Sequence, residues 1–156
     1  MAQFQTVLIT VFSGLFLFIL SQFFLKFILE PMVEVRKVIG KISSHLVLYA
    51  YRFSNVVETK ELYENEELRK AIMDVSTKTR TLASELQGTV QVVPLYSLFS
   101  SLGFIPKQEN IQDAISNLIG LSNSLSAHSD SRYDYIHFNN EKKDEINKCL
   151  KIKVKI

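Results

Sequence analysis

The sequence predicts an all-α fold, with one N-terminal transmembrane helix followed by a cytosolic bundle of four or five helices. Three observations support this fold class. In a chain of 156 residues, the first charged side chain is Lys26. Beyond it, apolar side chains recur at intervals of three and four, which is the period of an amphipathic helix. The alternation typical of a half-buried strand is confined to the closing KIKVKI segment.

The uncharged segment predicts a membrane-spanning helix within residues 1–29. As a helix, residues 4–25 would extend roughly 33 Å, close to the ~30 Å hydrocarbon core of a bilayer. A secretory signal peptide would need a basic leading region and a small-residue cleavage site, and the sequence has neither. A helix buried in a soluble core would need protein on every side, and the rest of the chain is too amphipathic to surround it.

Charges on either side of this segment predict its orientation. Lys26, Arg36, Lys37 and Lys41 follow it, whereas only the terminal amine precedes it. Positively charged flanks stay in the cytoplasm, so we expect the N-terminus outside and the C-terminus inside. The single cysteine, Cys149, cannot form an internal disulfide, which agrees with a reducing compartment.

Residues 30–150 are predicted to form the bundle. Glu30-Pro31 either ends the first helix or kinks one long helix, because proline lacks an amide N–H. Helical spacing then covers residues 32–56, 68–90 and 111–125, and a polar connection covers residues 58–67. Residues 94–103 suit a short helix ended by Gly103, and Asn110 suits the N-cap of the helix after it.

The end of the chain is predicted to be helical and then basic. Residues 132–150 read as one helix, or as two short helices broken near Asn139 and Asn140. Residues 151–156 form a basic tail. Its alternation of charged and apolar residues is compatible with an edge strand, and a frayed chain end is the favoured alternative. The resulting division is a transmembrane helix over 1–29, a bundle over 30–150 and a tail over 151–156.

Nothing in the sequence indicates an enzyme. The three histidines, His45, His128 and His137, share no metal-ligand spacing with one another or with Cys149. The sequence contains no G-x-S-x-G nucleophile motif and no glycine-rich phosphate loop. We therefore expect no catalytic residue, no metal site and no cofactor.

Small polar side chains follow one line along the predicted membrane helix. They recur at steps of three and four, and with one leucine they form the hydroxyl stripe: Thr6, Thr10, Ser13, Leu17 and Ser21. Lipid-facing hydroxyls bond back to their own backbone at little cost, so the stripe need have no function. A self-association seam is an equal alternative. In a third interpretation, four or more copies form a homo-oligomer in which these residues line a pore.

Four basic residues form the candidate ligand site: Arg69, Lys70, Lys78 and Arg80. Arg69 and Arg80 nearly coincide around a helix, and such clusters hold phosphate groups. The simpler interpretation, which the sequence favours, is a solvated face attracted to the anionic inner leaflet. The net charge of +2 names no partner.

Several motifs resemble a widespread family of small, poorly characterised bacterial single-pass membrane proteins. The resemblance covers most of the chain and rests on Glu30-Pro31, Asn55, Pro94-Leu95-Tyr96, Leu102-Gly103, Asn110-Ile111 and residues 118–123. These motifs carry no assigned chemistry. Some such proteins look like the transmembrane effectors of anti-phage operons, and the DNA-gated channel of Hailong-type systems is an analogue.

The resemblance implies how the two candidate sites would act together. A partner nucleotidyltransferase would make an oligonucleotide signal, which the basic cytosolic surface would bind. The expected function is thus a homo-oligomeric channel or membrane-disrupting effector of the bacterial inner membrane, gated by an anionic nucleotide-type ligand in anti-phage defence. The alternative is a membrane-tethered adaptor that recruits a cytosolic protein partner.

Overall fold

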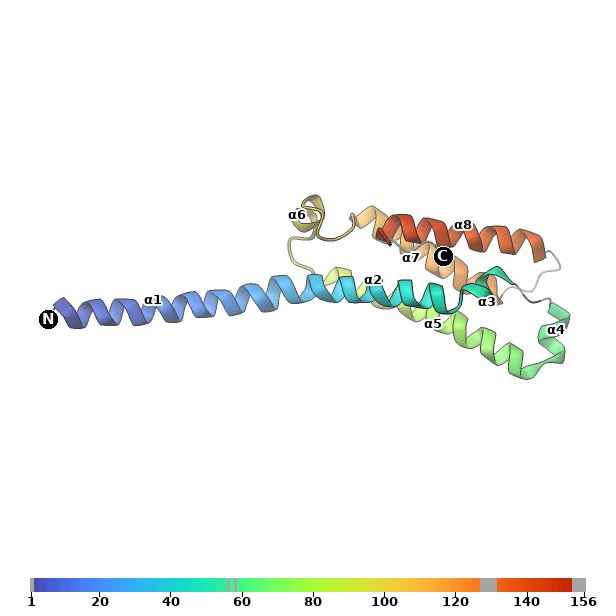
Figure 1. Cartoon of the computed structure of the whole chain (residues 1–156), viewed down its shortest axis with the longest axis horizontal. Coiled ribbons are helices and arrows are strands. Elements are labelled where there is room, and N and C mark those ends of the chain that lie inside the picture. Colours follow the sequence, from blue (N-terminus) through green and yellow to red (C-terminus); the bar gives the residue numbers. More distant parts are fainter. Residues whose placement is uncertain (1, 56, 58, 127–131, 153–156) are drawn as a thin grey trace.

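One long helix projects from a helical bundle (Figure 1). The computed structural model describes residues 2–55, 57, 59–126 and 132–152, and within them every regular element is helical. In chain order the elements are α1 Ala2–Phe24, η1 Leu25–Leu29, α2 Glu30–Leu48, α3 Ala50–Ser54, α4 Thr59–Glu64, α5 Glu66–Gln91, α6 Tyr96–Ser101, α7 Gln108–Ser126 and α8 Arg132–Leu150. The predicted fold class, an apolar N-terminal helix followed by a helical bundle, is confirmed.

The projecting helix continues into the bundle without a loop. Its 46 residues, Gln3–Leu48, include the π-helical turn η1, which ends immediately before Pro31. Pro31 has no N–H for the carbonyl four residues earlier, and its ring crowds that carbonyl. The wider turn relieves this crowding, because the Glu30 N–H reaches back five residues to the Leu25 carbonyl. Of the two alternatives at Glu30-Pro31, the continuous helix is therefore correct.

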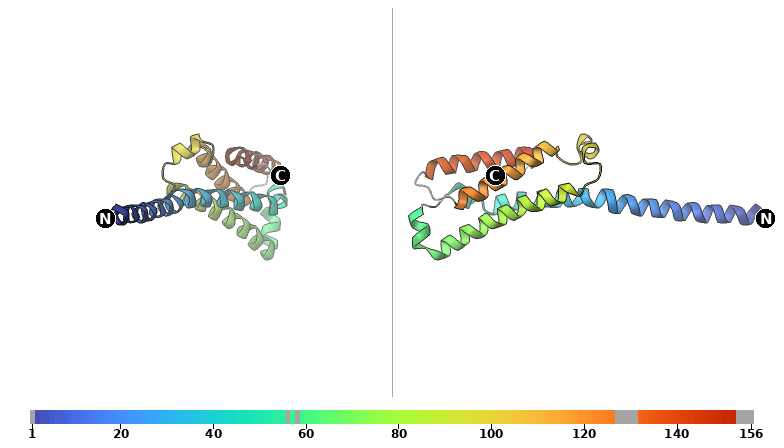
Figure 2. Two further views of the ribbon diagram at one scale, coloured as in Figure 1. Left: turned by 60° about the vertical axis from the view of Figure 1, so that its left-hand side comes forward. Right: turned by 180° about the vertical axis from the view of Figure 1, so that it is seen from behind.

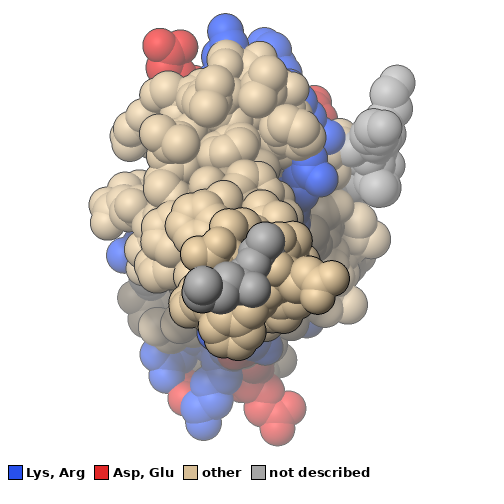
Figure 3. Space-filling view, turned by 90° about the vertical axis from the view of Figure 1, so that its left-hand side faces the viewer, with Lys and Arg blue, Asp and Glu red and all other residues tan. Residues whose placement is uncertain are grey.

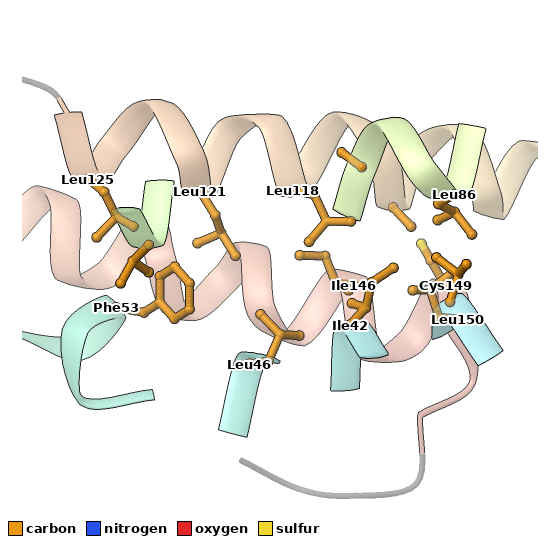
Figure 4. Close-up of a cluster of buried hydrophobic side chains, with 14 of the residues drawn as sticks. Ile42, Leu46, Phe53, Leu86, Leu118, Leu121, Leu125, Ile146, Cys149 and Leu150 are labelled. Carbon is orange, nitrogen blue, oxygen red and sulfur yellow. The ribbon is translucent and has the colours of Figure 1, made fainter. Parts of the chain in front are cut away.

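The core lies between α2, α5, α7 and α8, with α3 closing one end (Figures 2 and 4). Each long helix contributes an apolar stripe at helical spacing, so the four stripes face one another. Fully buried side chains along this core include Ile42, Leu46, Phe53, Leu86, Leu118, Leu121 and Ile146. Such close packing fixes the relative positions of the helices that present the candidate sites.

Three predicted boundaries differ from the structure. The helix expected over residues 32–56 breaks at Tyr49, whose φ of −106° and ψ of 16° leave the helical region. This break turns Phe53 of α3 into the core. The connection expected over residues 58–67 contains the short helix α4. Finally, α7 begins at Gln108 with the Ile111 N–H bonded to the Lys107 carbonyl, so Asn110 lies inside the first turn.

The C-terminal helix α8 is unbroken across Asn139 and Asn140. The side chain of Asn139 is fully buried and donates to the Phe53 carbonyl over 3.0 Å. Its polar atoms are thus satisfied by α3 and α7 partners rather than by its own backbone. After α8, Lys151 adopts a left-handed φ of 55° and the Ile152 N–H bonds to the Asn147 carbonyl, which caps the helix. The rest of the predicted tail lies outside the described residues.

Candidate functional site

The hydroxyl stripe is the first of the two candidate sites, and it lies along one side of α1. All five of its residues are exposed, as are the apolar side chains on the other sides of this helix. None of the residues in the most apolar part of Gln3–Leu48 is buried inside the protein. Among the helices of the described residues, this is the one that is long and apolar enough to cross a membrane.

Two hydroxyls of the stripe bond back to the helix that carries them. Thr10 Oγ1 donates to the Thr6 carbonyl over 2.9 Å, and Ser21 Oγ donates to the Leu17 carbonyl over 2.8 Å. These bonds use the hydroxyl protons, and because both residues are exposed, each oxygen can still accept a hydrogen bond from outside the helix. Beside the stripe, a Cβ built on Gly14 would meet nothing within 4 Å, which leaves room for another helix to approach closely.

A groove marks the point where α1 meets the bundle. It has a volume of about 770 Å³ and runs from Gln22 and Lys26, past Pro31, to Thr89 and Val92 at the end of α5. Lys37 also lines it and pairs with Glu34 at 2.6 Å. The residues that line this groove come from two distant parts of the chain, 22–37 and 89–92, and only tertiary packing brings them together. No motif in the sequence therefore indicates the groove.

The four predicted ligand residues do not form one cluster. Arg69 and Lys70 lie in the first turns of α5, where both pair with Glu66 at 2.6 and 3.5 Å. The hydrogen bond from Arg69 lowers the pKa of Glu66 below its ordinary value. Arg80 lies on the same side of α5 as Arg69 but about 16 Å from it along the helix axis, at about 1.5 Å per residue.

The other two basic residues face different neighbours of α5. Arg80 donates to the side chain of Asn123 on α7. Lys78 faces α2 instead, pairing with Asp74 at 2.6 Å and lying 6.0 Å from the centre of the Tyr49 ring. The Asp74 hydrogen bond, followed by that of Tyr49, raises the pKa of Lys78. Any anion that binds here must therefore compete with carboxylates already in place.

A buried hydrogen bond lies beneath Lys78. His45 of α2 and Thr79 of α5 are both buried, and the His45 Nε2 to Thr79 Oγ1 distance is 2.8 Å. Thr79 donates its own proton to the Val75 carbonyl, so His45 is the donor of the pair. Burial, and then the charge of Lys78, lowers the pKa of His45, while Asp74 opposes this shift. The neutral imidazole thus holds α2 against α5.

Sequence reasoning missed a second groove and a buried lysine. The groove, about 500 Å³ in volume, lies between α2 and α5 and includes Leu48, Tyr49 and Lys78. Lys143 is buried on α8, where its amine donates to Ser54 Oγ over 3.1 Å and burial lowers its pKa. Most lysines in proteins are exposed, so the sequence gives no sign that Lys143 is buried; the packing of α3 on α8 is what buries it.

No group of three or more His, Cys, Asp or Glu side chains within the described ranges could hold a metal ion. Comparisons with protein-family models, curated proteins and solved structures found no match for this chain. The family resemblance therefore stays a prediction, and the sites must be interpreted from their own geometry.

Proposed function

We propose that this chain is a single-pass inner-membrane protein whose copies assemble through α1 into an ion channel or membrane-disrupting effector. The observation that carries the proposal is the exposure of α1. Its apolar side chains are exposed along the whole helix and would face water in a soluble monomer, which is unfavourable by about 25 cal/mol per Å². A bilayer removes that cost, and the basic flank beyond Lys26 favours a cytosolic bundle.

The hydroxyl stripe supports assembly around a polar path. Because one helix cannot enclose a pore, conduction requires several copies with their stripes facing a common axis. Thr10 and Ser21 have turned their protons to their own backbone, so their outward oxygens would act as acceptors along that path. The open surface at Gly14 lets neighbouring helices pack closely beside it.

The basic residues of α5 supply the proposed contact with an anionic nucleotide-type signal in anti-phage defence. Their ion pairs are exposed, and exposed pairs contribute only about 0–1 kcal/mol each. A ligand carrying several phosphates, such as an oligonucleotide from a partner nucleotidyltransferase, would displace Glu66 and Asp74 at modest cost. To switch the channel from mostly closed to mostly open, it must favour the open state by about 5.5 kcal/mol.

Potassium release from liposomes tests the channel. Full-length protein would be reconstituted with and without short single-stranded DNA as the anionic probe. Thr10→Leu should abolish release because it replaces an outward oxygen with an apolar side chain. The matched control is Phe12→Leu, since two residues turn the helix by about 200° and place Phe12 on the opposite side. Normal release by Thr10→Leu would exclude this lining, and release by neither protein under any condition would exclude the channel.

The groove between α2 and α5 favours the adaptor as a second candidate function. Leu48 of α2, which lines the groove, and Tyr51 of α3 are each 71% exposed, and Val47 of α2 is also exposed. The end of α2 and the start of α3 thus present an apolar surface on which a protein partner would bind. Replacing residues 1–29 with an unrelated membrane anchor separates the two functions. Cellular activity that survives the exchange supports the adaptor, whereas activity lost while the protein stays in the membrane supports the channel.

A further inference from the structure

A second uncharged surface lies at the end of the bundle nearest α1. Between Glu85 and Lys107 the chain has no charged side chain. Within this stretch, five exposed apolar residues form the apolar α6 surface: Val92, Leu95, Leu98, Leu102 and Phe104. The three leucines are 62%, 51% and 60% exposed. Viewed along α1, this end of the protein is largely free of charge and charged residues gather at its edges (Figure 3).

The side chains of helix α6 divide into two groups, one packed against the bundle and one exposed. Tyr96 and Phe99 point inward and pack on a small cluster that contains Met32 and Val35 of α2. Leu98 of α6, and Leu95 and Leu102 at its two ends, are exposed and do not belong to this cluster. The inner contacts hold α6 in place, so its leucine side is presented by the fold rather than by chance exposure.

Three features fix the segment around α6 in this position. The Arg36 guanidinium donates twice to the Phe104 carbonyl, over 3.0 and 2.7 Å, which ties the segment to α2. The Tyr96 hydroxyl donates to the Pro106 carbonyl over 2.8 Å and closes the loop. Gly103 has a φ of +80°, a conformation that glycine adopts without strain, and this turns the chain back toward α7.

The helix α6 lies beside the part of the long helix that would emerge from the membrane if α1 spans it. Its inner cluster reaches Ile28 and Met32, within about 9 Å of Lys26 along the helix at 1.5 Å per residue. Lys26 is the first charge after the apolar segment, so its ammonium belongs at the headgroups. Interfacial helices bury their apolar side about 5–10 Å into the boundary between headgroups and acyl chains. Figure 1 and Figure 2 agree that α6 lies beside the junction of α1 and α2.

We propose that the apolar α6 surface inserts into the membrane interface and forms a second lipid contact beside α1. The occupant is the bilayer itself, because the surface lies beside the end of the proposed spanning helix (Figures 1 and 2). Lys26 follows the apolar segment of α1 and Lys107 follows the uncharged stretch around α6, and both are exposed, which suits anionic headgroups. This inference rests on the proposed membrane insertion of α1. It adds that the bundle is held against the bilayer at a fixed orientation.

Single-tryptophan variants test the contact, because the chain contains no tryptophan of its own. Leu98→Trp reports on α6, Phe12→Trp reports on α1, and Met73→Trp, at an exposed position on α5, is the control away from the membrane. Each full-length variant is reconstituted in vesicles of phosphatidylcholine and phosphatidylglycerol. The phosphatidylcholine is brominated near the headgroup or, in a second preparation, near the end of the acyl chain, because bromine quenches tryptophan on contact.

The expected results differ for the three positions. Shallow bromines should quench Leu98→Trp at least about twofold more strongly than deep bromines, as for an interfacial helix. Deep bromines should quench Phe12→Trp, and neither should quench Met73→Trp. Unquenched Leu98→Trp with quenched Phe12→Trp overturns the α6 contact alone. If Leu98→Trp is shielded from aqueous iodide yet unquenched by bromine, a second protein copy covers α6 and the inference is wrong. Unquenched Phe12→Trp overturns the membrane insertion itself.

Discussion

Replacing Asn139 with alanine should destabilise the bundle more than any exposed substitution on α8. Its buried amide donates to the Phe53 carbonyl over 3.0 Å and accepts from the Ser124 hydroxyl. Alanine leaves the Phe53 carbonyl without this donor, at about 1–3 kcal/mol for a buried polar group, and loses the Ser124 bond at about 1 kcal/mol. A better helix propensity returns about 0.5 kcal/mol. The free energy of unfolding should therefore fall by about 1.5–3.5 kcal/mol.

The neighbouring residue supplies the matched control. Asn140→Ala makes the same chemical change one position along α8, where the side chain is exposed. It should change the free energy of unfolding by no more than about 0.5 kcal/mol. Urea unfolding of full-length protein in detergent micelles, followed by circular dichroism, measures both variants. Equal stability of the two variants would refute the reasoning that the buried amide joins α3 and α7 to α8.

Three further outcomes follow from single sites. The lowered pKa of His45 means that the unfolded chain binds more protons than the folded chain at acidic pH. The free energy of unfolding should therefore be highest above about pH 6.5 and fall as the pH drops below that value. His45→Gln should remove this pH dependence, as measured by urea titrations. Gly40→Ala should raise the free energy of unfolding by about 0.5–1 kcal/mol, because the added methyl group would meet nothing within 4 Å in the middle of a helix. Gly103→Ala should lower the free energy of unfolding in the same assay, because Gly103 has a positive φ that alanine adopts only with strain. Burial raises the pKa of the Cys149 thiol, so iodoacetamide should alkylate it slowly until urea unfolds the bundle; rapid alkylation of the folded protein would contradict this.

Local patterns in the sequence predict most of the fold. The absence of charge before Lys26 indicates the projecting helix, and period-three and period-four spacing indicates the long helices of the bundle. The errors fall where tertiary contacts override local preference. Tyr49 breaks a helix whose apolar spacing continues through it, because Phe53 gains a buried position. Asn139 suits a break in isolation, yet its partners on other helices satisfy it.

The candidate sites could be predicted only in part. The hydroxyl stripe depends on spacing within one helix, so the structure places its five residues along one side of α1 as the sequence does. The basic residues depend on which neighbours α5 meets, and spacing alone cannot tell that Lys78 faces α2 while Arg80 faces α7. The grooves are formed by segments far apart in the chain, so no local pattern indicates them. The apolar α6 surface comes from one uncharged stretch, but which of its side chains stay exposed depends on how that stretch packs against α2.

The loop-free junction at Pro31 has a mechanical consequence. The 23 residues of α1 form an arm about 35 Å long, at about 1.5 Å per residue, and the π-helical turn η1 joins it to α2 without a loop. Because the arm and the bundle share one helix, a tilt of the whole bundle by about 10° would carry the far tip through roughly 6 Å by simple geometry on that length. In the proposed membrane assembly, small changes in the angle between neighbouring bundles would therefore produce large changes of spacing between the far ends of their α1 helices.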